Sequence, residues 1–164
     1  MAFLLGTNVK KTKPMYKHIL LATDGLEPSI KAETYALQLN VSNNIQLTVI
    51  HVLDDKLCHY GKVDTLAPLE ARESFIDYVI EEQKEASKES LERLKTQANS
   101  LGANYELLIQ AGEPVDVITS IANDSTIDLV ILGGKRSKRA RGFKSLCFAD
   151  KLSSKIEQSI ITII

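Results

Sequence analysis

Five short apolar runs, separated by helical stretches, constrain the fold of this chain more than any other feature. The runs lie at residues 18–22, 45–52, 105–110, 129–132 and 160–164. Most are continuously apolar instead of alternating, which is typical of strands buried on both faces of a sheet. Strands joined by helices pair in parallel through right-handed crossovers. The order therefore predicts a single-domain α/β fold, a doubly wound five-stranded parallel sheet with helices on both faces.

The segments between these runs predict four amphipathic helices. They are expected at residues 28–40, at 75–101, from Glu113-Pro114 to Ala122, and at 144–157. The outer face of the long second helix is expected to carry three ion pairs, Glu81–Lys84, Glu85–Lys88 and Glu89–Arg93. Gly102 follows this helix, where a left-handed cap favours glycine. Residues 54–72 are expected to be irregular, and residues 1–14 to form a flexible leader before a domain at 15–164.

Composition narrows the class of protein. The 164 residues include 20 Lys and Arg against 21 Asp and Glu, a formal net charge of -1. This balance argues against a net positive potential that would attract nucleic acid or a membrane surface. Cys58 and Cys147 lie far apart and match no metal-binding spacing. No apolar run approaches the roughly 20 residues that a membrane helix needs. We expect a soluble protein of the reducing cytoplasm with no metal site.

Ligands of open parallel sheets bind beyond the carboxyl ends of the strands, where the strand order reverses. Ala22-Thr23-Asp24-Gly25 ends the first strand. Asp24 could accept hydrogen bonds from a ribose hydroxyl or an adenine amino group. Alternatively it caps the helix that begins near Pro28 or braces the turn, and the residues alone favour this structural role.

The segment after the fourth strand has the composition of an anion site. Gly133-Gly134 precede residues 135–144, which hold six basic side chains and no acid. Glycines before a helix let backbone N–H groups approach a phosphate. A nucleic acid is a second possible partner, although Phe143 is the only aromatic residue there. A solvated basic loop is the commoner fate of such a run, and no P-loop or GxGxxG motif is present.

The residue pattern contains no arrangement typical of nucleophilic catalysis, so we expect no catalytic residues. None of the three histidines has a motif-placed serine or cysteine partner. His51 lies within an apolar strand, as a core histidine would. Cys147 falls near the start of the last predicted helix, where it is expected to act as a small buried apolar side chain.

Several segments, taken in order, resemble the universal stress protein (UspA-like) family. They are Tyr16 to Gly25, Glu27-Pro28-Ser29, Leu47 to Val52, Gly112-Glu113-Pro114, Asp128 to Gly133 and Ala149-Asp150-Lys151-Leu152. The resemblance covers nearly the whole chain from Met15 onward. It implies a Rossmann-like fold of the adenine nucleotide alpha-hydrolase-like type, and a homodimer formed through the last strand. Such a dimer would also cover an apolar sheet edge at residues 159–164.

The resemblance also implies where a nucleotide would bind. ATP-binding members resemble one another in a Gly-x2-Gly-x9-Gly-[Ser/Thr] loop after the fourth strand. Alignment on Ala149-Asp150-Lys151 places Gly133 at the first glycine, Arg136 at the second, and Leu146-Cys147 at the final pair. Three of the four positions therefore depart from the motif.

The other candidate binding residues are retained. Ala22, Thr23, Asp24, Val52, Leu132 and Gly133, together with the divergent Arg136, make up the candidate site. We expect a non-catalytic stress-response module that binds ATP weakly or not at all and has no other cofactor. The alternatives are a nucleotide-binding member with a divergent phosphate loop, and an anion- or nucleic-acid-binding module using residues 135–144.

Overall fold

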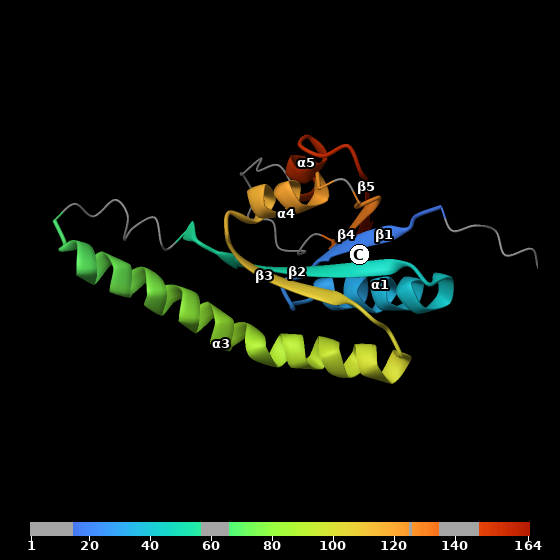
Figure 1. The fold of residues 1–164 in the computed structure, drawn as a ribbon, viewed down its shortest axis with the longest axis horizontal. Helices are drawn as coiled ribbons and strands as arrows, with labels where there is room; N and C mark the ends of the chain where they lie inside the picture. Colours follow the sequence, from blue (N-terminus) through green and yellow to red (C-terminus); the bar gives the residue numbers. More distant parts are fainter. Residues whose placement is uncertain (1–14, 57–65, 125, 135–147) are drawn as a thin grey trace, which may run out of the picture.

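The computed structural model describes residues 15–56, 66–124, 126–134 and 148–164. Its strands are β1 (His18–Ala22), β2 (Gln46–Asp54), β3 (Glu106–Gly112), β4 (Leu129–Gly133) and β5 (Ser159–Ile163). They form one sheet in the order β3-β2-β1-β4-β5, and every pair of neighbours is parallel (Figure 1). The predicted five-stranded parallel sheet is confirmed.

Helices cover both faces of this sheet. Helices α1 (Ser29–Asn43) and α3 (Leu69–Leu101) lie on one face, where Leu37 and Leu94 join a core with Leu21 and Val49. Helices α4 (Pro114–Ala122) and α5 (Phe148–Ser153) lie on the other. Alternate residues of the central strands feed the two cores, so β1 and β4 are buried on both sides, as their continuous apolar sequence predicts.

The largest differences from the predicted helix bounds are at α3 and α5. Helix α3 begins at Leu69, six residues before the predicted start, so the end of the segment expected to be irregular is helical. The last helix ends at Ser153 instead of residue 157. The hydroxyls of Ser153 and Ser154 donate to the carbonyls of Asp150 and Lys151, at 2.9 and 2.8 Å. Such local bonds compete with helix propagation and account for the early end.

The amino-terminal ends of β1 and β4 are joined by Asp128. Its Oδ2 accepts hydrogen bonds from the backbone N–H groups of Lys17 and His18, at 2.8 and 3.0 Å, and these bonds lower the pKa of the carboxyl. The imidazole of His18 is buried and hydrogen-bonded to the hydroxyls of Thr48 and Thr126. Burial lowers the pKa of His18, against the smaller opposing effect of Asp128. Both groups hold the end of the sheet opposite the candidate site.

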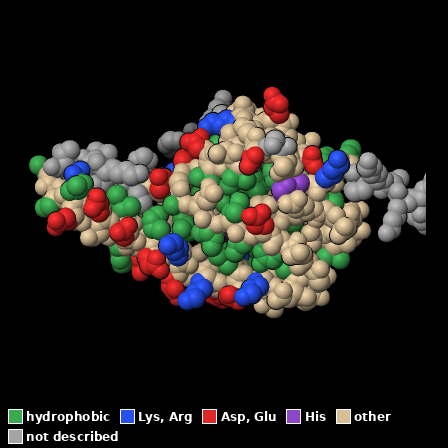
Figure 2. Space-filling model, in the orientation of Figure 1, with side chains coloured by type: hydrophobic (Ala, Val, Ile, Leu, Met, Phe, Trp, Pro, Cys, Tyr) green, Lys and Arg blue, Asp and Glu red, His purple; other side chains and the backbone are tan. Residues whose placement is uncertain are grey.

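Helix α3 is longer than the sheet it covers. Its amino-terminal part extends past the ends of the strands, and acidic side chains follow this part along the surface (Figures 1 and 2). Leu69 and Tyr78 in this part are 61% and 62% exposed, whereas Leu94 and Ala98 are buried in the core. The carboxyl-terminal half of α3 therefore carries most of its packing. No helix in the described ranges is both long enough and apolar enough to cross a membrane.

Candidate functional site

The strand order reverses between β1 and β4, so the crevice expected of this fold lies beyond their carboxyl ends. Ala22 is the register partner of Leu132 on β4 and of Ile50 on β2. The side chains of Ala22, Leu132 and Val52 all belong to the core on the α4 and α5 face, and Val52 is only half-buried. The structure thus brings three of the predicted site residues together on one face of the sheet.

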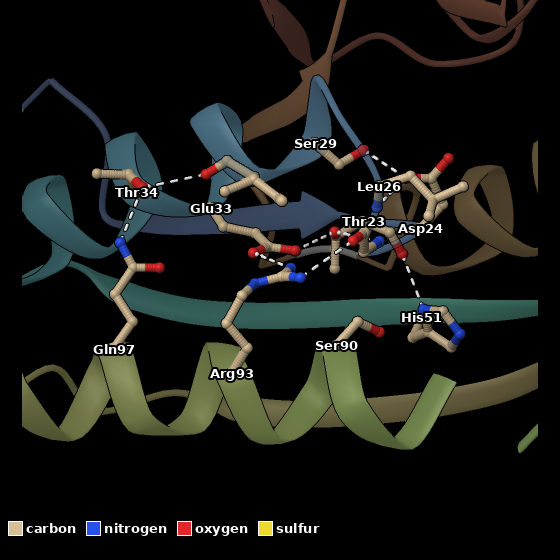
Figure 3. Close-up of polar contacts among 12 residues, drawn as sticks. Thr23, Asp24, Leu26, Ser29, Glu33, Thr34, His51, Ser90, Arg93 and Gln97 are labelled. Carbon is tan, nitrogen blue, oxygen red and sulfur yellow. Dashed lines mark hydrogen bonds and ion pairs between the residues drawn. The ribbon is translucent and has the colours of Figure 1, made fainter. Parts of the chain in front are cut away.

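Asp24 lies at the rim of this crevice and braces the turn after β1. Its Oδ1 accepts hydrogen bonds from the backbone N–H of Leu26 at 3.0 Å and from the hydroxyl of Ser29 at 2.8 Å (Figure 3). The first bond closes an Asx turn, and the second ties the turn to the first residue of α1. The predicted bracing role is confirmed. The side chain is nevertheless exposed at the surface.

Thr23 points away from the crevice, toward α1 and α3. Its hydroxyl donates to Oε1 of Glu33 at 2.5 Å and accepts from the backbone N–H of Gly25 at 3.0 Å. Glu33 is 1% exposed, and its Oε2 accepts a hydrogen bond from Arg93 on α3 at 3.0 Å (Figure 3). Thr23 therefore contributes to the site by fixing the loop, since its side chain lies on the other side of the sheet from Val52.

The pairing predicted for Arg93 is wrong. Glu81–Lys84 and Glu85–Lys88 are paired on the outer face as expected, at 3.4 and 3.3 Å, but Arg93 turns inward to Glu33. Glu33 lies on the buried stripe of α1 with Ala32 and Ala36. A carboxylate on such a stripe needs a cationic or hydrogen-bonding partner, because burial of an unpaired charge is costly. The position of Glu33 on the helix therefore signals that it needs a partner, although it does not identify Arg93 as that partner.

His51 is a core histidine, as predicted, and it also holds the loop. The residue is 6% exposed, and its Nδ1–H donates to the carbonyl of Thr23 at 3.0 Å (Figure 3). The backbone N–H of Thr23 donates to the carbonyl of Ile50 at 3.1 Å. The β1 loop is thereby joined to β2 at both the N–H and the carbonyl of one residue.

Gly133 and Gly134, at the end of β4, let backbone segments pack closely against one another. A Cβ on Gly133 would lie 2.7 Å from the backbone N and Cα of Ser29, so glycine lets β4 pass close to the start of α1. The backbone N–H of Gly134 donates to the carbonyl of Ile163 on β5. A donor bonded within the sheet is not available to a phosphate. Arg136, Cys58, Cys147 and residues 135–144, including Phe143, lie outside the described residues.

These residues fit the two ends of a nucleotide unequally. The side of the crevice next to β1 and β2 offers the Asp24 carboxylate and the apolar Val52, which suit a ribose and a base. The end of β4 offers less to a phosphate. Ser29 of α1 fills the space beside Gly133 where a Cβ would lie, and the N–H of Gly134 is already bonded. Among the described residues, no group of three or more His, Cys, Asp or Glu side chains could hold a metal ion.

The doubly wound sheet with its crevice at β1 and β4 defines a Rossmann-like α/β module, and comparison with known proteins defines its family. The family described as Universal stress protein family matches residues 15–155. This chain therefore belongs to the universal stress protein family.

Individual proteins agree with that assignment. The chain is 26% identical over 144 residues to the universal stress protein YxiE of Bacillus subtilis, covering 88% of this chain and 93% of YxiE. The structure of UspA from Lactobacillus plantarum is similar, with a TM-score of 0.73, 19% identity, and coverage of 91% and 98%. The Archaeoglobus fulgidus universal stress protein in complex with dAMP has a TM-score of 0.60, 17% identity, and coverage of 92% and 100%. At these identities the solved structures establish the shared fold.

Proposed function

We propose that this chain is a non-catalytic stress-response module that weakly binds the nucleoside part of an adenine nucleotide and gains little from the phosphates. Asp24 and Val52 supply the nucleoside end of the crevice. The bond from the Gly134 N–H to the carbonyl of Ile163 is the observation that carries the proposal, because it withdraws a backbone donor from the phosphate end. The dAMP complex of a structural neighbour supports a nucleoside ligand at this fold. The chain has only two cysteines, far apart in the sequence, which supports the reducing cytoplasm as the location of this protein.

The test is equilibrium binding of AMP, ADP and ATP to the purified chain and to Asp24→Ala. Loss of Asp24 removes a contact to the ligand and a brace of the loop, so a control is needed that weakens the brace alone. Ser29→Ala does this, because it deletes one of the two donors to Asp24 and leaves the carboxylate and the bond from the Leu26 N–H in place. We expect Asp24→Ala to weaken AMP binding more than Ser29→Ala does. Equal affinity in all three proteins would contradict the assignment of Asp24 to the nucleoside.

We propose further that the protein is a homodimer formed through β5. Within the described residues, this strand is one edge of the sheet and has β4 as its one partner strand. Ile160, Ile161 and Ile163 are each partly accessible, and Ile164 is 86% exposed. An apolar edge of this kind pairs with a further strand unless it is protected. A second copy of the same strand would cover it.

Sedimentation tests this assembly. A chain ending after Gln158 should sediment as a monomer or aggregate, because the edge strand is removed. The opposite edge supplies the control, since Ile109 on β3 is 44% exposed. Ile109→Lys should leave the assembly unchanged. An intact chain that remains monomeric at micromolar concentration would contradict the proposed dimer.

A further inference from the structure

We infer that Glu33 and Arg93 are positioning residues for the nucleoside site, and that through them helix α3 controls how tightly the site holds its ligand. The inference rests on the proposed nucleoside binding and adds two residues that do not line the crevice. It comes from the way Asp24 is held. Asp24 lies between Thr23 and Gly25, and both of these neighbours are hydrogen-bonded to one ion pair, formed by the buried Glu33 and the partly exposed Arg93 (Figure 3).

Glu33 holds the first side of the loop. One carboxylate oxygen accepts the Thr23 hydroxyl and the other accepts the guanidinium of Arg93, so both oxygens are engaged. Because Glu33 is 1% exposed, water cannot replace either partner. The Thr23 hydroxyl passes this constraint on, since it also accepts the N–H of Gly25.

Arg93 holds the second side. Its Nη2 donates to Glu33, and its Nη1 donates to the carbonyl of Gly25 at 3.2 Å. The planar guanidinium fixes these two directions together, which a lysine ammonium does not. The Nε of Arg93 is buried without a hydrogen-bonding partner. Burying an unpaired N–H is unfavourable, so the arginine at this position favours the interpretation that it does more than fill space.

Helix α3 contacts the segments that carry Asp24 and Val52 at two further points. A Cβ on Gly25 would lie 2.5 Å from the Cβ of Ser90, one turn before Arg93, so the loop rests directly on the helix. Two turns earlier still, Gln83 Nε2 donates to the carbonyl of Asp54 at 2.7 Å, at the end of the strand that carries Val52. One rigid helix therefore touches both segments that supply the nucleoside contacts.

If Glu33 and Arg93 served stability alone, apolar side chains would be expected at their positions. Buried ion pairs contribute little net stability compared with apolar side chains of similar volume, so packing alone does not account for this one. What the pair does provide is a fixed direction for the backbone on each side of Asp24. If that direction sets affinity, thermodynamic reciprocity requires that a bound nucleoside also tighten α3 against the loop.

The experiment measures AMP binding and unfolding free energy for the wild-type chain and three variants. Arg93→Lys keeps the charge beside Glu33 but cannot direct two bonds as the fork does. The double variant Glu33→Gln with Arg93→Met removes both charges together, so neither is left buried alone. Ile127→Val is the control, since Ile127 is buried just before β4, on the other face from Glu33 and Arg93 and at the end of the sheet opposite Asp24 and Val52.

We expect AMP affinity to fall about fivefold or more in Arg93→Lys and in the double variant, at the lower end of typical coupling between sites. Ile127→Val should lower stability without changing affinity by as much as about twofold. AMP should also slow amide exchange of residues 89–94 in the wild-type chain, and do so less in Arg93→Lys.

Two results would overturn the inference, and they are distinguishable. If the wild-type chain binds AMP and both variants bind it equally well, the pair is structural and the inference is wrong while the proposed function stands. If the wild-type chain binds no AMP at millimolar concentration, the proposed function itself is wrong and the inference falls with it.

Discussion

The loops after β1 and β4 meet at the same crevice but are held in opposite ways. Side chains from α1, α3 and β2 hold the β1 loop, through Glu33, Arg93 and His51. The described part of the β4 loop is held by backbone contacts, Gly133 against α1 and the Gly134 N–H against β5. Asp24 is exposed at the surface, whereas the Gly134 N–H, a donor that a phosphate could use, is bonded within the sheet. This difference predicts a site that can bind a nucleoside at the β1 end but binds phosphates poorly at the β4 end.

The largest expected effect comes from breaking the brace of the β1 loop. Arg93→Ala leaves the buried Glu33 carboxylate without its cation, which should lower the free energy of unfolding by about 3 kcal/mol. Urea denaturation measures the loss. The matched control is Lys88→Ala on the same helix, whose pair with Glu85 is exposed and should contribute less than about 1 kcal/mol. Equal losses in both variants would contradict a buried brace.

The second prediction concerns Gly25, where the β1 loop rests on α3. Gly25 and Gly102 have nearly the same left-handed conformation, with φ of 73° and 68°. A Cβ on Gly102 meets nothing within 4 Å, whereas a Cβ on Gly25 would overlap Ser90. Gly102→Ala should cost about 1 kcal/mol for the conformation alone. Gly25→Ala should cost about 2 kcal/mol more, because the overlap is added.

Thermal or urea unfolding of the two glycine variants checks this difference. A loss in Gly25→Ala no larger than that in Gly102→Ala would show that the loop does not press against α3. The contrast between the two loops would then lose its physical basis on the β1 side.

The third prediction restores the β4 loop instead of damaging the β1 loop. The triple change Arg136→Gly, Leu146→Gly and Cys147→Ser recreates the family's phosphate motif in the sequence. We expect ATP affinity to rise about tenfold, equivalent to about 1.4 kcal/mol, with AMP affinity unchanged. Calorimetry of both nucleotides checks it. No gain for ATP would mean that the divergent motif is not what limits phosphate binding.

The smallest expected effect lies at the other end of the sheet. Burial lowers the pKa of His18, so the folded chain binds this proton less readily than the unfolded chain does. Stability should therefore fall as the pH drops below the ordinary histidine value of about 6.5 and continue to fall toward the lower folded pKa. Urea midpoints between pH 7.5 and pH 5, at about half-unit steps, measure the slope. His18→Gln should make the slope shallower, and an unchanged slope would assign it to other groups.

The arrangement of the sheet was predictable because each strand carries its own signal. Continuous apolar residues such as those at 129–132 identify a strand with two buried faces, and the alternation with helices imposes parallel pairing. Gly102 could be placed at the end of α3 for the same reason, since a left-handed cap favours glycine locally. Features determined within a few residues of sequence were recoverable.

The brace of the β1 loop was not predictable, because its partners lie far apart in the chain. Arg93 has an acid four residues before it, Glu89, and helical spacing alone assigns it to that neighbour. Its actual partner, Glu33, is 60 residues away and is found only when α1 and α3 are packed on one face. The same holds for Gly134, whose partner Ile163 belongs to another strand. Which groups remain available to a ligand depends on such distant contacts.

The most direct test of the two unequal ends is the ratio of the AMP and ATP dissociation constants at low and high salt. With the phosphate end impaired, ATP should bind no more than about tenfold tighter than AMP, a difference of about 1.4 kcal/mol. Any advantage of ATP should shrink as salt rises, because it would come from the charge of basic side chains instead of from backbone donors, and salt screens charge interactions beyond about 10 Å at 0.1 M. ATP binding about a hundredfold tighter than AMP, and unchanged by salt, would contradict the account.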